Sequence, residues 1–449
     1  MKIILIVIDA LRADSLSCYG YPLETSPGID RIVGEGVLFE NAYTQANWTN
    51  PSLYSFLTGL YPSTHGVSGF NQNLGEKVTT LPGFLSGNGY RTFLFSNYYV
   101  LLDRKRLGKH FQEALYFDID SNEKKLCRTF TDSEGSDLFA VVHVGNYIHE
   151  PYCASSREVS RFWKGAFPKR KIIRVLTEEA GLDDESMQNV LRSVNLRKER
   201  LDRKEITFLK ACYDAGIRHV DAWLTGFFNF LTTTCRDDII LVITADHGQG
   251  FFEHGFFGHG LNLNEEIAKV PLIFWMSREK RGLRMKSTVQ LIDVFPTLIE
   301  LLTWQDPPAI DGVSFAGCLQ GVEEASRWAV CEGFPFAACV HDCKKLILSI
   351  YRLIEAAERT DRLKKLVLKR RFRKLFLHLY SIFHGGLYDL TKDPGEKKNL
   401  KRSDPATFTR MEGYLRAWYK KVSACTPEVT TEKLEEDRII EQLKSLGYL

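Results

Sequence analysis

Short apolar segments alternate with helical stretches along the N-terminal part of the chain, and this alternation restricts the fold more than any other feature. The segments are rich in Val, Ile, Leu and Phe, and each has the length of one strand. They are KIILIVI, VLFENAYT, RTFLFSN, DLFAVVHV, DIILVITA and PLIFWM, at residues 2–8, 37–44, 91–97, 137–144, 238–245 and 271–276. Strands that alternate with helices are typical of a mostly parallel sheet with helices on both faces. We therefore predict a doubly wound α/β fold.

The length of the chain leaves room for one large domain and a smaller appendage. Its 449 residues, 44% of them hydrophobic, can bury a sizeable core. We predict a main α/β domain over residues 1–320 and a small C-terminal α+β subdomain over residues 321–449. The elements predicted for the subdomain are strands in RWAVCEGF, KKLILSIY and GGLYDL, followed by terminal helices that include a charged helix at about 404–425.

Two basic stretches exceed what such a sheet requires. Residues 155–210 are rich in Arg and Lys and have helical periodicity, so we predict a helical cap or insertion beside the site. Residues 354–384 form a second predicted helical insertion, in which segment 361–374 carries eight basic residues. A basic amphipathic helix can contact an anionic membrane or a polyanionic substrate. The alternative is a solvated helix face, since the net charge is only +3, and we find no nucleic-acid-binding motif.

Polar residues follow two of the predicted strands. Asp9 ends the first strand, and Asp246 and His247 come directly after a later one. Thr49 precedes a helix that begins at Pro51, so we expect Thr49 to be the N-cap. Because the carboxyl ends of parallel strands meet at one edge of a sheet, these four side chains can converge. Backbone N–H groups at the helix start would then stabilise an alkoxide on Thr49, whereas in isolation Thr49 is an ordinary N-cap.

This set of side chains is suited to a hard divalent cation. Three oxygen ligands and one imidazole fit manganese, zinc, magnesium or calcium, and not copper, which favours thiolates. Donors for a second cation are available, although each of them taken alone is more often a core residue. They are His143, His149, Glu253, His254 and His259. We assign His65, in PSTHG, to structure.

Longer blocks occur along the chain in a fixed order. They include IDALRADSLSCYGY, TNPSLYSFLTGLYPSTHG, GYRTFLFSN, HVGNYIHEPY, TADHGQGFFEHG, DGVSF and LYDLTKDPGEKKNL. In these blocks and their order the chain resembles the sulfatase-like branch of the alkaline phosphatase superfamily. The resemblance implies a metal-dependent ester hydrolase with that α/β fold.

The same resemblance implies roles for individual residues. The implied metal ligands are Asp9, Thr49, Asp246 and His247. Thr49 is also the implied catalytic nucleophile. His149, in IHEPY, and His259, in FGHG, are similar to the histidines that contact the anionic head of the substrate or protonate the leaving group, so both are catalytic and substrate-binding candidates. Asn97, which ends GYRTFLFSN, is a further substrate-binding candidate.

The chain departs from the sulfatase pattern in two ways. The C/S-x-P-S-R motif reads TNPSL here, without its oxidisable residue or its arginine. Formylglycine is an aldehyde made from a primary carbon, whereas oxidation of the secondary alcohol of Thr49 gives a ketone. We therefore expect no formylglycine and a simple alkoxide nucleophile. Ala10 stands where calcium sulfatases usually carry a second aspartate, and His247 where they commonly carry asparagine, which favours manganese or zinc.

Both departures resemble the threonine-dependent phosphate, phosphonate and phosphodiester branches and the transferases of envelope polymers. We therefore expect a hydrolase, or a transferase, of anionic esters through Thr49, with phosphate, phosphonate or phosphodiester as the ester. Its substrate would be a small molecule or a lipid headgroup. The first alternative is sulfuric ester hydrolysis. The second is an inactive scaffold or binding protein of the same family.

The expected location is cytoplasmic. Only six consecutive apolar residues separate Lys2 from Asp9, and no run approaches the length of a transmembrane helix. We therefore expect neither a signal peptide nor an anchor. The ten cysteines show no disulfide-framework spacing, and a cytoplasmic chain would keep them reduced.

Overall fold

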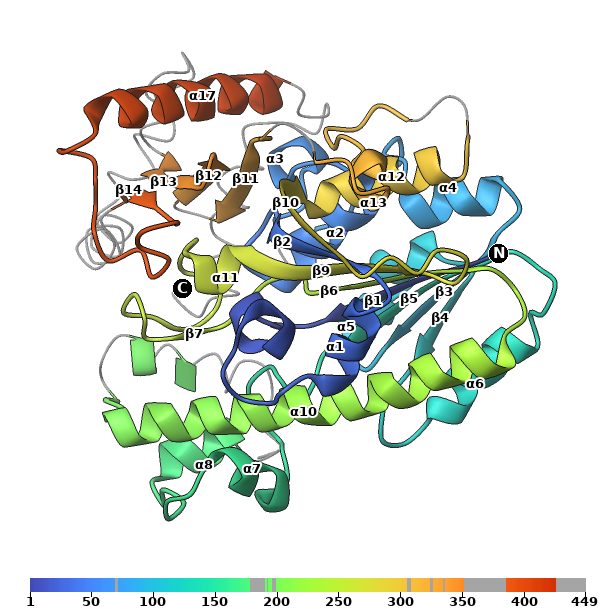
Figure 1. Cartoon of the computed structure of the whole chain (residues 1–449), viewed down its shortest axis with the longest axis horizontal. Helices are drawn as coiled ribbons and strands as arrows, with labels where there is room; N and C mark the ends of the chain where they lie inside the picture. Colours follow the sequence, from blue (N-terminus) through green and yellow to red (C-terminus); the bar gives the residue numbers. More distant parts are fainter. Residues whose placement is uncertain are drawn as a thin grey trace.

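The computed structural model of the chain describes residues 1–68, 72–177, 190–191, 193–195, 199–304, 308–323, 326–333, 336–350 and 385–424. Its large sheet contains β1 (Lys2–Ile8), β2 (Val37–Tyr43), β3 (Arg91–Ser96), β4 (Glu113–Tyr116), β5 (Leu138–Val144), β6 (Ile239–Thr244), β9 (Lys269–Met276) and β10 (Leu283–Gln290). The order of these strands is β10-β2-β9-β6-β1-β5-β3-β4 (Figure 1). A separate hairpin pairs β7 (Gly250–Phe251) with β8 (Phe257–Gly258).

The large sheet is mostly parallel, which confirms the prediction from the alternating segments. Strand β9 runs antiparallel to both of its neighbours, β2 and β6, and the other pairs are parallel. All of the predicted strands of this sheet are present. The sequence pattern does not predict β4 and β10, which lie at the two edges. An edge strand is less apolar than a central one, and β10 carries Arg and Lys while β4 has only four residues.

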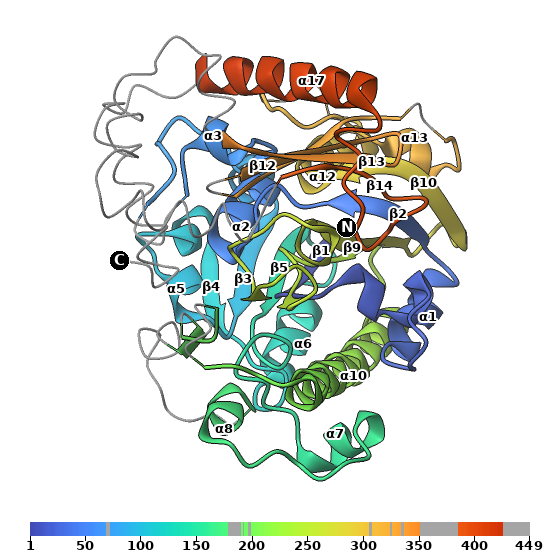
Figure 2. The same ribbon diagram turned by 90° about the vertical axis from the view of Figure 1, so that its left-hand side faces the viewer.

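Helices cover both faces of the sheet, as predicted (Figures 1 and 2). One face carries α1 (Pro27–Val33), α6 (Glu123–Thr131) and α10 (Arg203–Thr234), and the other carries α2 (Thr49–Thr58), α4 (Leu81–Gly87) and α12 (Val294–Leu301). The central strands are therefore buried along their whole length, as β1, β5 and β6 show. Further helices are α3 (Pro62–His65), α5 (Tyr99–Leu102), α7 (Ser156–Phe162), α8 (Lys171–Thr177), α11 (Glu265–Ala268) and α13 (Ala316–Leu319).

A second, smaller sheet lies beyond the main one. It is antiparallel and consists of β11 (Ala329–Gly333), β12 (Phe336–His341), β13 (Lys344–Ser349) and β14 (Leu387–Asp389), and α17 (Pro405–Ala424) packs on it (Figures 1 and 2). These elements agree with the predicted strands and charged helix, except that β12 is additional. Their apolar cluster also includes Tyr61 and Ile292 of the main sheet's side. The boundary near residue 320 stays a prediction.

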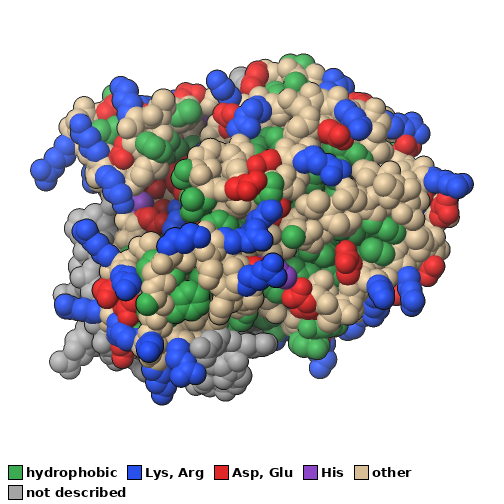
Figure 3. Space-filling view, turned by 60° about the horizontal axis from the view of Figure 1, so that its bottom comes forward, with side chains coloured by type: hydrophobic (Ala, Val, Ile, Leu, Met, Phe, Trp, Pro, Cys, Tyr) green, Lys and Arg blue, Asp and Glu red, His purple; other side chains and the backbone are tan. Residues whose placement is uncertain are grey.

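Only parts of the two predicted insertions belong to the described residues. Within 155–210, α7 and α8 lie against α10, on the side away from the sheet (Figure 1). On the face that Figure 3 brings forward, basic side chains are scattered among acidic and apolar ones. Residues 354–384, with the basic segment 361–374, lie outside the described residues, so the predicted contact with an anionic membrane stays a prediction. Across the described ranges, no helix is long and apolar enough to cross a membrane.

Candidate active site

The three central strands bring titratable side chains to one edge of the sheet. Strands β6, β1 and β5 are neighbours, and their register aligns Val7 with His143 on one side and with Thr244 on the other. Asp9 follows directly after β1, and Asp246 follows β6 with only Ala245 between them. The turn after β1 puts Ala10 at a φ of 59°, and the Ala10 N–H donates to Asp246 Oδ1 at 3.2 Å. The predicted convergence of carboxylates therefore occurs.

Thr49 joins this group from the start of α2. It is the first residue of the helix and not its N-cap, so the N-cap prediction is wrong. The N-cap position belongs to Trp48, whose φ of −163° and ψ of 163° are extended. Instead of capping the helix, Thr49 Oγ1 lies 3.2 Å from His247 Nε2. Ser52, one turn along α2, donates to the Asp246 carbonyl at 2.6 Å and so fixes the helix start against the strand end.

The hydrogen bonds of His247 fix which of its nitrogens carries a lone pair. Nδ1 lies 2.9 Å from the Gly248 carbonyl, which can only accept, so Nδ1 is the donor and Nε2 carries the lone pair of the neutral ring. Nε2 lies 3.5 Å from Asp9 Oδ1 and 3.5 Å from Asp246 Oδ2. Both carboxylate oxygens are buried and have no hydrogen-bond partner. Buried lone pairs that face one another repel, and a cation between them would stabilise them.

The donor set therefore fits a divalent metal ion. Two carboxylates, one imidazole nitrogen and one hydroxyl are a donor set that hard and borderline divalent cations accept. Burial, and after it the negative charge of Asp246, raises the pKa of Asp9 well above its ordinary value. Burial likewise lowers the pKa of His247. Both shifts mean that, without a cation, Asp9 and His247 favour their neutral forms.

His143 belongs to the same group, although sequence reasoning treats it only as a donor for a second cation. Its ligating nitrogen lies within 4.8 Å of the carboxylate oxygens of Asp9 and Asp246. Its Nδ1 faces the Ser96 hydroxyl at 3.1 Å, its Nε2 is buried without a partner, and burial lowers its pKa to about 4. The signal for it was available, because His143 lies near the carboxyl end of the strand next to β1.

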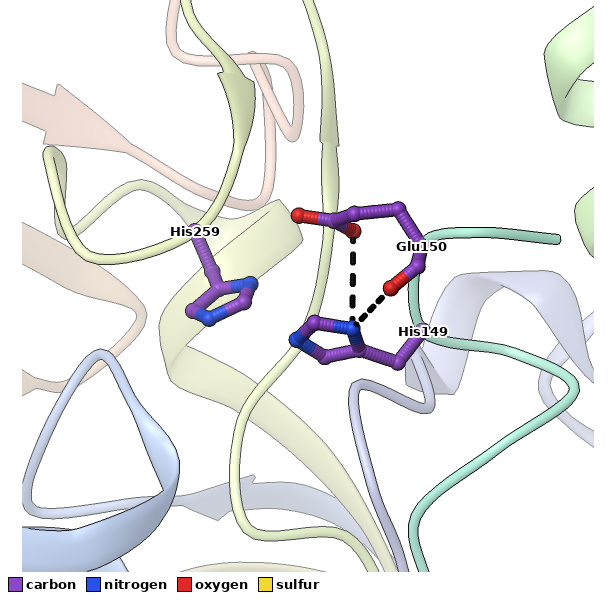
Figure 4. Close-up of side chains that lie close together, drawn as sticks. All are labelled: His149, Glu150 and His259. Atoms are coloured by element: carbon purple, nitrogen blue, oxygen red, sulfur yellow. Dashed lines mark hydrogen bonds and ion pairs between the residues drawn. The ribbon is translucent and has the colours of Figure 1, made fainter. Parts of the chain in front are cut away.

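His149 and His259 form the outer part of the site (Figure 4). Their ring centroids lie 4.8 Å apart, and the His259 ring stacks on His247 with 4.3 Å between centroids. Both histidines therefore lie beside His247, and their catalytic and substrate-binding roles stay predictions. Glu150 completes a group of three whose ligand atoms lie within 4.8 Å of one another. Sequence reasoning did not select Glu150.

Hydrogen bonds orient both outer rings. His149 Nδ1 donates to the Glu150 carbonyl at 2.7 Å. His259 Nδ1 donates to Gln249 Oε1 at 3.2 Å, since the Gln249 amide nitrogen donates to Glu150 Oε2. Burial lowers the pKa of His149, but the charges of Glu150 and Asp9 outweigh burial and raise it to about 9. Burial, then His247 and His149, lowers the pKa of His259 well below its ordinary value. His149 is therefore the histidine that holds a proton most firmly.

The remaining candidates lie at the margin of the site or away from it. Asn97 follows β3, and its Oδ1 accepts from the Gly145 N–H at 2.9 Å. His254 faces acceptors with both nitrogens, Glu266 Oε1 at 2.8 Å and the Gly395 carbonyl at 3.1 Å, so it has no lone pair for a metal. Glu253 pairs with Arg12. His65 has the predicted structural position, because its ring bridges Ser55 Oγ at 3.0 Å and the Val67 N–H at 3.1 Å.

Known proteins are similar to this chain in sequence and in fold. A family model described as Sulfatase matches residues 2–303. An arylsulfatase of Clostridium perfringens is 22% identical over 387 residues, which are 73% of this chain and 79% of that protein. A multifunctional alkaline phosphatase superfamily protein of Trinickia caryophylli is 24% identical over 403 residues, 70% of this chain and 76% of that protein. The solved structure of a phosphonate monoester hydrolase from Silicibacter pomeroyi has a TM-score of 0.68 and 17% identity, covering 96% of each chain.

The family model spans the sheet, the Thr49 helix and the loop with Asp246, His247 and His259. Proteins of this family are generally dependent on divalent metal ions, which agrees with the buried donor groups. The chain therefore belongs to the sulfatase family and is an ester hydrolase of the alkaline phosphatase superfamily.

Proposed function

We propose that the protein is a metal-dependent hydrolase of anionic phosphorus esters that uses Thr49 as its nucleophile. The observation that carries this proposal is the position of Thr49 Oγ1, 3.2 Å from His247 Nε2 and at the N-terminus of α2. A hydroxyl there adjoins the unpaired oxygens of Asp9 and Asp246. The substrate class would be a phosphate, a phosphonate or a phosphodiester.

The choice of phosphorus over sulfur rests on the chemistry of residue 49. Oxidised threonine is a ketone, so the aldehyde hydrate that expels sulfate by elimination cannot form. Leu53, at the motif's arginine position, is only 2% exposed and packs into the core. An alkoxide nucleophile accepts the phosphoryl group from the ester, and water then hydrolyses the phosphothreonine. Neither step needs the aldehyde hydrate.

The residues divide the metal and nucleophile roles between them. Asp9, Asp246, His247 and Thr49 would hold the cation, with His143 beside them. Such a cation lowers the pKa of a hydroxyl ligand and neutralises charge on the substrate's non-bridging oxygens. Thr49 Oγ1, having lost its proton to solvent, attacks phosphorus as an alkoxide and is released again as the alkoxide in the second half. A bond from Thr49 Oγ1 to phosphorus forms, and the bond to the leaving oxygen breaks. The product of this step is a phosphothreonine at residue 49.

The outer histidines handle the protons. The leaving alkoxide takes a proton from His149, whose pKa is raised, while the neutral His259 ring between His149 and His247 would contact the anionic head of the substrate. In the second half, the deprotonated imidazole accepts a proton from water, whose oxygen attacks phosphorus and releases Thr49. The proton count then returns to its starting value. If an alcohol replaces water, the same steps make the protein a transferase.

Sulfuric ester hydrolysis is the second candidate. Curated relatives mostly carry sulfatase names, among them a Δ4,5-hexuronate-2-O-sulfatase and an N-acetylglucosamine-6-O-sulfatase of Bacteroides thetaiotaomicron. The shared fold is as compatible with the hydrolysis of sulfate esters as with the hydrolysis of phosphorus esters. An inactive scaffold is the third candidate, and the unpaired buried oxygens of Asp9 and Asp246 count against it because they are costly without a cation.

A panel of 4-nitrophenyl esters separates the first two candidates. We expect the protein, loaded with manganese or zinc, to hydrolyse a phosphate, phosphonate or phosphodiester with a kcat/KM at least about tenfold above that for the sulfate, a difference of about 1.4 kcal/mol in barrier. The leaving group is the same throughout, so the comparison isolates the central atom. Faster turnover of the sulfate would reverse the order of the two candidates.

A further inference from the structure

His259 lies on a backbone that has little rigidity of its own. It follows β8, between Gly258 and Gly260, whose φ values are 83° and 85°. Glycine adopts such left-handed conformations freely and loses more conformational freedom than other residues when it is held in one. The place of the His259 ring therefore depends on contacts that fix the chain on either side of the two glycines.

The downstream contact leads to the nucleophile. The Gly260 N–H donates to the Asn47 carbonyl at 2.9 Å, and Asn47 lies just before the N-cap residue of α2. Asn47 Nδ2 also donates to the Asn262 carbonyl at 3.2 Å. The chain after His259 is thus tied to the segment that carries Thr49.

The upstream contact comes from the predicted insertion at 155–210. Asn195 Nδ2 donates to the Phe257 carbonyl at 3.0 Å, and Asn195 Oδ1 accepts from the Phe257 N–H at 2.8 Å. The Asn195 side chain is only 7% exposed. One side chain thereby satisfies both backbone groups of a buried residue in β8, as a neighbouring strand would do.

The Phe257 side chain extends this link to the outer histidines. Its ring packs against Tyr152 and Phe251. The Tyr152 hydroxyl accepts from the Gln249 amide at 2.6 Å, and Gln249 Oε1 accepts from His259 Nδ1. A shift of Phe257 would therefore move both the backbone before His259 and the acceptor that orients its ring.

We propose that Asn195 is a positioning residue for His259, and that the insertion holds the histidine in register with Thr49 through this side chain. The proposal rests on the role of His259 given under Proposed function. Asn195 itself contacts none of the reacting atoms in the proposed reaction. Its effect is transmitted through the backbone and the ring of Phe257.

Two substitutions test whether Asn195 holds the Phe257 backbone in place, and a third serves as a matched control. N195A removes both hydrogen bonds, and N195D keeps the acceptor for the Phe257 N–H but loses the donor to its carbonyl. The control is N122A. Asn122 makes the same kind of double contact, accepting from the Asp118 N–H at 2.8 Å and donating to the Tyr116 carbonyl at 3.2 Å, beside the edge strand β4.

We expect N195A to lower kcat for the fastest 4-nitrophenyl ester by about tenfold to a hundredfold with little change in KM, and N195D to lie between it and the wild type. N122A should leave both constants near the wild-type values. In an H259A background, N195A should cause no further loss, because the positioned group is gone. Amide hydrogen exchange at 256–262 should become at least about tenfold faster in N195A and stay unchanged in N122A.

The exchange measurement needs no turnover, so it separates this proposal from the proposed function. Unchanged amide exchange at 256–262 in N195A and N195D would overturn the proposed role of Asn195, whatever values of kcat and KM the two variants have. Faster exchange together with losses that add in the N195A/H259A protein would also overturn it, since Asn195 would then act elsewhere. Full activity of H259A alone would contradict the role of His259 in the proposed function, while exchange still decides whether Asn195 holds the loop.

Discussion

Replacing Thr49 with alanine should lower kcat for phosphorus esters by at least about a thousandfold, or about 4 kcal/mol in barrier. The reason is that alanine removes the only proposed nucleophile and one of the four proposed ligands while the rest of the cluster stays in place. Steady-state kinetics of the manganese-loaded T49A protein, with the 4-nitrophenyl esters, measures the loss.

Two further variants make this result specific. T49S keeps a hydroxyl at the same place and should retain activity within about tenfold of the wild type. T58A removes the hydroxyl of another buried threonine in the same helix, which donates to the Tyr54 carbonyl at 2.7 Å and lies outside the site. T58A should keep the wild-type kcat. Comparable turnover by T49A and wild type would remove Thr49 from the mechanism.

The second large effect is the change in Tm that D9N causes, and its sign should differ between the cation-free and the metal-loaded protein. In a chelator, D9N should have a higher Tm than the wild type, because it removes the charge of one of two neighbouring buried carboxylates, each of which has an oxygen without a hydrogen-bond partner. The raised pKa of Asp9 also predicts that D9N is more stable than the wild type when no cation is bound. The stabilising protonated form is lost as pH rises, so the cation-free wild type should weaken toward alkaline pH and D9N should weaken less.

With manganese or zinc the order should reverse. A cation at a hundred times its Kd stabilises the folded wild type by about 2.7 kcal/mol, and D9N should gain much less of this. Thermal melting with and without metal, together with the metal content per chain, measures both arms. D221N is the control, since the Asp221 carboxylate accepts from the Gly28 and Ile29 N–H groups at 3.0 and 2.8 Å. D221N should lower Tm equally in both conditions.

A lower Tm for D9N in the chelator, with equal gains from metal in both proteins, would contradict the cation site. It would mean that the Asp9 carboxylate is stabilised by the protein alone.

The sequence was sufficient to predict the central sheet and the edge at which its chemistry gathers. Strands β1, β5 and β6 are continuous apolar runs because both of their faces are covered, and such runs can be recognised directly. The edge strands β4 and β10 have no such run, so periodicity did not reveal them. Strand β12 follows Gly333 and Pro335, but its small residues in AACVH form neither a bulky apolar run nor a clear alternation, so it was not predicted.

Other features depended on contacts between distant residues, which no local pattern encodes. Thr49 looked like an N-cap because serine and threonine favour that position, but His247 draws its hydroxyl into the site. Glu150 and Asn195 are buried polar residues whose partners lie far away in the chain. These contacts can be recognised only in the folded structure, where the segments before and around His259 lie next to Glu150 and Asn195.

The central claim is that Thr49 forms a covalent bond to phosphorus, and the most direct test is to trap that bond. Acid quenching of the manganese-loaded protein during turnover of a 4-nitrophenyl phosphorus ester, followed by proteolysis and mass measurement, should show a phosphoryl or phosphonyl group on the peptide that contains Thr49. The same peptide from T49S should carry it on Ser. Rapid turnover with no adduct on this peptide, or with the adduct on another residue, would contradict the account.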